Sequence, residues 1–166
     1  TEHSDKPLEA LHLLYTGVQN NVSNSLVLMA DRLGFSLTLA TPEPAETQES
    51  FDADLQAMII NNPLIVRVND PRDAVASADF IYTDVWLSMG EEESGWAERI
   101  KLLTPYRVTS ELMAATGNPF TKFMHCLPAF HDMETEIGAH ISQKYGIDCM
   151  EVTDEVFESE ASIVFD

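Results

Sequence analysis

Residues 11–40, LHLLYTGVQNNVSNSLVLMADRLGFSLTLA, set the pattern on which the fold prediction depends. Residues 11–15 form a short apolar run, which is typical of a buried strand. Apolar residues then recur at helical spacing over 22–33, and Gly34 follows where a helix commonly ends. Residues 36–40 are apolar again. This stretch therefore predicts a strand, a helix and a second strand.

The same alternation continues along the chain. Further apolar runs predict strands at 64–68, 80–83, 122–125 and 149–152. Apolar spacing or helix-start signals predict helices at 51–59, 71–78, 92–103, 109–116 and 133–145. Apolar strands that alternate with helices indicate a parallel sheet covered on both sides. We predict an α/β fold, a doubly wound Rossmann-like sheet with helices on both faces, in a single domain spanning residues 1–166.

Composition argues against several classes of function. The chain has 28 Asp and Glu against 9 Lys and Arg, a net charge of −19, and such a surface repels phosphate backbones. We therefore expect neither nucleic acid nor membrane as a partner. No apolar run approaches the roughly 18 residues of a spanning helix, and the polar N-terminus does not resemble a secretory signal. Cys126 and Cys149 lack metal-type spacing and suggest free thiols in a reducing cytoplasm.

Common cofactor and nucleophile motifs are missing from the sequence. The first predicted strand is followed by Gly17 alone and not by G-x-G-x-x-G, which disfavours dinucleotide binding. A phosphate-binding P-loop and a G-x-S-x-G elbow are also missing, and the five histidines show no zinc-type spacing. We therefore expect no cofactor and no metal.

Three polar clusters follow predicted strands, at 19–21, 84–90 and 125–132. In doubly wound sheets, ligands bind beyond the carboxyl ends of the strands. Asp84 is suited to bind an amine, while Ser88 and loop N–H groups are suited to bind a carboxylate. Together they would hold a zwitterion. The alternative is that Asp84 caps the next helix and the loop is an ordinary turn.

Each of the other two clusters also allows two interpretations, one as a ligand contact and one as ordinary structure. Cys126 at a strand end is placed to touch a ligand, or it is a buried thiol of the core. Leu127 precedes Pro128 and is expected in an extended or turn conformation. The amides of Asn20 and Asn21 are suited to bind either end of a zwitterion, or they begin a helix as ordinary capping residues.

Taken together, these motifs resemble the ornithine carbamoyltransferase family. The matching stretches include NNVSNSL at 20–26, YTDVWLSMGEE at 82–92, KFMHCLPAFHD at 122–132 and MEVTDEVFES at 150–159. The D-x-x-x-S-M-G loop is characteristic of the branch of the family that uses ornithine. The resemblance covers nearly the whole chain.

The resemblance implies a role for each matching residue. The residues that would bind the α-amino and α-carboxylate groups of ornithine are Asn21, Asp84, Ser88 and Met89. Cys126 would orient the δ-amine or take part in its deprotonation, and Cys126 and Leu127 would contact the carbamoyl group of carbamoyl phosphate. The implied reaction is attack of the δ-amine on the carbamoyl carbon, which gives citrulline and phosphate. The implied assembly is a homotrimer.

The chain also departs from the family. The family's Ser-x-Arg-Thr-Arg motif, which holds the phosphate on an N-terminal domain, does not occur among these residues. We therefore expect this chain to be the ornithine-binding half of an enzyme and to be inactive alone. The turn at 17–21 is one residue shorter than the family's usual turn. Two other functions remain open: a transcarbamylase for another amine or amino acid, and a non-catalytic amino-acid-binding module.

Overall fold

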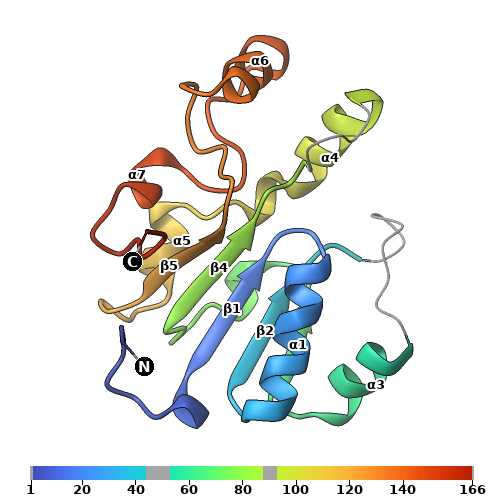
Figure 1. Ribbon diagram of the computed structural model, residues 1–166, viewed down its shortest axis with the longest axis vertical. Coiled ribbons are helices and arrows are strands. Elements are labelled where there is room, and N and C mark those ends of the chain that lie inside the picture. Colours follow the sequence, from blue (N-terminus) through green and yellow to red (C-terminus); the bar gives the residue numbers. More distant parts are fainter. Residues whose placement is uncertain (1, 44–52, 88–92, 166) are drawn as a thin grey trace.

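The computed structural model describes residues 2–43, 53–87 and 93–165 (Figure 1). Within this part of the chain, one parallel sheet has the strand order β3-β2-β1-β4-β5. Its strands are β1 (His12–Thr16), β2 (Ser36–Ala40), β3 (Ile65–Val68), β4 (Phe80–Asp84) and β5 (Lys122–Cys126). The order reverses between β1 and β4, which is the switch point where such sheets place their ligands. The predicted doubly wound α/β fold is confirmed.

The described residues contain six α-helices and four short 3-10 turns. They are α1 (Asn21–Leu33), α3 (Ala53–Asn61), α4 (Trp96–Leu103), α5 (Ser110–Ala115), α6 (Glu136–Tyr145) and α7 (Asp154–Phe157). The 3-10 turns cover Leu8–Ala10, Pro71–Asp73, Glu93–Gly95 and Thr104–Tyr106. Helix α1 begins at the cap residue Asn20 and ends at Gly34, whose φ of 76° lies in the left-handed region that glycine tolerates. In Figure 1, α1 crosses the face of β1 and β2, while α4 and α6 extend beyond the carboxyl ends of the strands.

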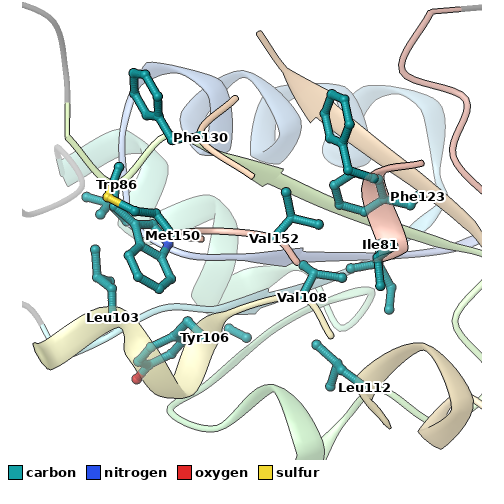
Figure 2. Packing of buried hydrophobic residues seen from close by; sticks show 14 of the residues in the cluster. Ile81, Trp86, Leu103, Tyr106, Val108, Leu112, Phe123, Phe130, Met150 and Val152 are labelled. Carbon is teal, nitrogen blue, oxygen red and sulfur yellow. The ribbon is translucent and has the colours of Figure 1, made fainter. Parts of the chain in front are cut away.

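Strand residues alternate between two apolar layers. Tyr15 and Phe80 face a cluster completed by α1 and α3. Leu14, Ile81 and Phe123 face the opposite cluster, which receives residues of α4, α5 and α7. Figure 2 shows part of this second cluster, including Trp86, Leu103, Tyr106, Met150, Val108 and Val152. Both faces of the sheet are therefore apolar, as the sequence predicted.

Two predicted elements are wrong. The helix expected to continue through 74–78 ends at Asp73; Ser77 has a φ of 62° and donates its N–H to the carbonyl of Thr116, which turns the chain away. The strand expected at 149–152 is only a single bridge between Val152 and Val108. Arg107 explains the second difference, because its guanidinium donates to the carbonyls of Cys149 and Met150 and ties this segment beside Val108 rather than to the sheet edge.

None of the helices in the described ranges is both long enough and apolar enough to cross a membrane.

Candidate active site at the carboxyl edge of the sheet

The last residues of β4 and β5 lie side by side at the carboxyl edge. Asp84 and Cys126 are partners in the parallel register, so both side chains point to the same face of the sheet. Tyr82, two residues before Asp84, shares that face and packs edge-on against Tyr15, with ring centroids 6.3 Å apart. Tyr15 belongs to the layer under α1. The carboxylate and the thiol therefore gather on the α1 side of the switch point, as the strand-end argument expected.

Asp84 is buried and both of its carboxylate oxygens are engaged. The side chain is only 8% exposed. Its Oδ1 accepts the N–H of Val85 at 2.8 Å, and its Oδ2 accepts the side-chain amide of Asn20 at 2.8 Å. An ionised carboxylate has about four lone-pair sites, so each oxygen keeps room for a further donor. Asp84 is thus a fixed acceptor with capacity for a cationic ligand.

The two neighbouring asparagines differ in their surroundings. Asn20 is the cap of α1: its Oδ1 accepts the N–H groups of Val22 and Ser23. Asn21 is the first helical residue, and its side chain is exposed. Sequence reasoning favoured Asn21 as a ligand contact and did not predict that Asn20 would reach Asp84. The other two predicted ornithine contacts, Ser88 and Met89, lie outside the described residues.

The thiol of Cys126 is partly buried and forms no disulfide. Burial raises the pKa of Cys126, and the negative charge of Asp84 raises this pKa further, while a hydrogen bond with the Tyr82 hydroxyl lowers it. Burial, followed by the charge of Cys126, raises the pKa of Tyr82 to about 12. At neutral pH both groups are therefore protonated. Tyr82 was missed from the sequence, although its position two residues before Asp84 on a strand is the signal that would have found it.

Leu127 follows Cys126 beyond the sheet edge. Its side chain is 48% exposed, and the Leu127–Pro128 peptide bond is cis. The sequence predicted an extended or turn conformation for this residue and did not predict the cis bond. An apolar side chain therefore projects into solvent next to the thiol.

His125 points away from Cys126, because successive strand residues face opposite sides of the sheet. Its Nε2 lies 3.1 Å from Oε1 of Glu151, and both side chains are fully buried. The same Glu151 oxygen accepts the N–H of Phe130 at 2.6 Å. This contact ties the segment after Cys126 back to β5. Glu151 was not predicted from the sequence as a partner of His125, since a spacing of 26 residues does not indicate a contact.

His131 lies beside α7. Its Nδ1 lies 2.8 Å from Oδ1 of Asp154, and its ring stacks on Phe157 with centroids 3.7 Å apart. Potential metal-ligand atoms of His131, Asp154 and Glu158 lie within 4.8 Å of one another. The Nδ1 of His131 is already engaged by Asp154.

The site geometry can be set beside known proteins. Residues 9–166 match the family described as aspartate/ornithine carbamoyltransferase, Asp/Orn binding domain. The chain belongs to this family. It is 48% identical over 170 residues to a catabolic ornithine carbamoyltransferase of Rhizobium meliloti, covering 99% of this chain and 50% of that relative. It is 47% identical over 167 residues to an ornithine carbamoyltransferase of Neisseria mucosa, covering 99% of this chain and 64% of that sequence.

Solved structures of the same family share the fold. The ornithine carbamoyltransferase from Pyrococcus furiosus matches with a TM-score of 0.70 at 33% identity, over 95% of this chain and 44% of that chain. The enzyme from Gloeobacter violaceus also gives a TM-score of 0.70, at 27% identity, over 98% of this chain and 47% of that chain. This carbamoyltransferase-family chain thus spans between half and two thirds of the curated relatives quoted above, and less than half of the solved chains.

Proposed function

We propose that residues 1–166 form the ornithine-binding domain of an ornithine carbamoyltransferase, which transfers the carbamoyl group of carbamoyl phosphate to the δ-amine of L-ornithine. The names of the relatives support this choice of substrate. The observation that carries the proposal is the pairing of Asp84, at the end of β4, with Cys126, at the end of β5. The pair lies next to the switch point, and Asn20 links Asp84 to the start of α1. These groups provide an anchored carboxylate and a thiol at one edge, next to the start of a helix.

Each group has a proposed part in holding the amino acid. Asp84 would accept the α-ammonium group, since each of its oxygens accepts one hydrogen bond from the described residues and an ionised carboxylate oxygen can accept two. Asn21 would contribute its exposed side-chain amide, and Ser88 and Met89 would complete the contacts to the α-amino and α-carboxylate groups. A charged hydrogen bond of this kind contributes about 1.5–3 kcal/mol. This arrangement would leave the δ-amine extended towards Cys126 and Leu127.

The chemistry requires removal of a proton from the δ-ammonium group. An alkyl amine of this kind has a pKa near 10.4 and is protonated at neutral pH. Desolvation in the closed site would lower this pKa. Because burial and the charge of Asp84 raise the pKa of Cys126, its thiol is a hydrogen-bonding group at neutral pH rather than a ready base. We therefore assign Cys126 the orientation of the δ-amine and of the carbamoyl group, with Leu127 as its neighbour.

The reaction needs a second half. The neutral amine nitrogen bonds to the carbamoyl carbon, the carbon–oxygen bond to phosphate breaks, and one proton passes from the nitrogen to the departing phosphate. We place the groups that hold the phosphate on an N-terminal carbamoyl-phosphate-binding domain, outside residues 1–166, and propose that the complete enzyme is a homotrimer. The 166-residue chain alone is then expected to produce no citrulline.

A substrate panel on the complete enzyme tests the proposal. L-ornithine is expected to be carbamoylated, whereas putrescine, N-acetyl-L-ornithine and L-aspartate are not. Cys126→Ser is expected to lower kcat more than the affinity for carbamoyl phosphate. Preference for another amine would assign a different transcarbamylase, and amino-acid binding without turnover would assign a binding module; either result would overturn the proposal.

A further inference from the structure

The side chain of Asn20 joins two parts of the site that are far apart in sequence. Its Oδ1 accepts the N–H groups of Val22 at 2.9 Å and Ser23 at 3.2 Å, which caps α1. Its Nδ2 donates to Oδ2 of Asp84 at 2.8 Å, across 64 residues of chain. The backbone N–H of Asn20 donates in turn to the hydroxyl of Ser23 at 2.8 Å. One amide therefore links the start of the helix to the end of β4.

The orientation of this amide is determined by its partners. A flipped amide would place the NH₂ group against the N–H groups of Val22 and Ser23, and its oxygen against the carboxylate of Asp84. Both arrangements are repulsive. The carbonyl oxygen must therefore face the helix and the NH₂ group must face Asp84, so Asn20 is held from both sides.

Asp84 depends on this donor for its own orientation. Its other oxygen is held by the adjacent backbone N–H of Val85. With the Val85 contact alone, the carboxylate would keep more freedom to rotate about its Cβ–Cγ bond. A donor on each oxygen fixes the plane of the carboxylate. A carboxylate that is already oriented loses less conformational entropy when a ligand binds.

We propose that Asn20 is a positioning residue, which holds the carboxylate of Asp84 in the orientation that receives the α-ammonium group of the amino-acid substrate. This inference rests on the proposed function, in which Asp84 is the ammonium ligand. Asn20 itself does not contact the substrate, in contrast to Asn21, whose exposed side chain is proposed to do so. Replacing the NH₂ group of Asn20 should weaken substrate binding even when the helix cap is kept.

Two substitutions keep the cap and remove the donor. Asn20→Ser and Asn20→Asp both retain an oxygen suited to a helix N-cap. In the complete enzyme, Asn20→Ser is expected to raise the KM for L-ornithine about fivefold or more, with a smaller change in kcat and an unchanged KM for carbamoyl phosphate. Asn20→Asp is expected to raise the KM further, because it places a second carboxylate against Asp84. Thr109→Ala is the matched control: it removes the cap of α5 and is expected to lower the Tm without raising this KM.

A double-mutant cycle separates positioning from a merely structural role. In an Asp84→Asn background, Asn20→Ser is expected to change the KM for ornithine less than twofold, since there is no carboxylate left to orient. Equal effects of Asn20→Ser in both backgrounds would overturn the inference. An unchanged KM for Asn20→Ser together with a raised KM for Asp84→Asn would also overturn the inference, but it would leave the proposed function intact. An unchanged KM for Asp84→Asn would overturn both.

Discussion

The buried pair of His125 and Glu151 leads to the sharpest prediction about stability. Glu151→Ala removes the oxygen that accepts the N–H of Phe130 and faces Nε2 of His125. The side chains of His125 and Glu151 are both fully buried, so the groups that lose their acceptor are shielded from bulk water. A buried polar group left without a partner costs about 1–3 kcal/mol, and Glu151→Ala takes the acceptor away from two of them, the N–H of Phe130 and Nε2 of His125. We therefore expect Glu151→Ala to lower the free energy of unfolding by about 3–5 kcal/mol.

Urea unfolding followed by circular dichroism measures this loss directly, and thermal unfolding should show a Tm lowered by about 6–20 °C for a chain of this size. Glu151→Gln is the close control, because its amide oxygen still accepts from Phe130 and its volume is nearly the same. It is expected to cost less than half as much. Glu160→Ala, at an exposed site, should change stability by about 0.5 kcal/mol or less. A loss below about 1 kcal/mol for Glu151→Ala, or equal losses for the alanine and glutamine variants, would refute the reasoning.

Two further predictions concern the thiol and the core. The pH at which alkylation of Cys126 by iodoacetamide reaches half its maximal rate should lie above the usual range for thiols. Tyr82→Phe should raise this pH, because it removes a hydrogen bond to the thiolate. Asp84→Asn should lower it, because it removes a negative charge. Values of this pH that do not move in these opposite directions would contradict the electrostatics of the site. Phe123→Ala in the fully buried layer should cost about 3–5 kcal/mol in urea unfolding, whereas Phe120→Ala, at a side chain 80% exposed, should cost far less; similar losses would contradict the packing.

Much of the fold followed from periodicity. Residues 11–40 were predicted as a strand, a helix and a strand because apolar spacing changes from contiguous to helical and back, and the structure confirms β1, α1 and β2. The meeting of Asp84 and Cys126 was also predictable, since the carboxyl ends of parallel strands lie at one edge. Both inferences use only local patterns and the general rule of sheet topology.

Contacts between distant polar groups could not be predicted in the same way. The link from Asn20 to Asp84 depends on the path of the turn after β1, where Gly17 has a φ of 134°. The pairing of His125 with Glu151 depends on how the segment between them folds back. The sequence predicted a strand at 149–152, whereas Val152 makes only a single bridge to Val108. Hydrogen bonds of this kind are set by tertiary packing, which apolar spacing does not encode.

L-norvaline tests most directly whether Asp84 is the ligand of the α-ammonium group, because it has the α-amino and α-carboxylate groups of ornithine but no δ-amine. The measurement is the affinity of the complete enzyme for L-norvaline, by calorimetry in the presence of carbamoyl phosphate. We expect Asp84→Asn to weaken binding about tenfold or more, and Cys126→Ser, whose proposed contacts are with the δ-amine and the carbamoyl group, to change it less than about threefold. An unchanged affinity in Asp84→Asn would contradict the account.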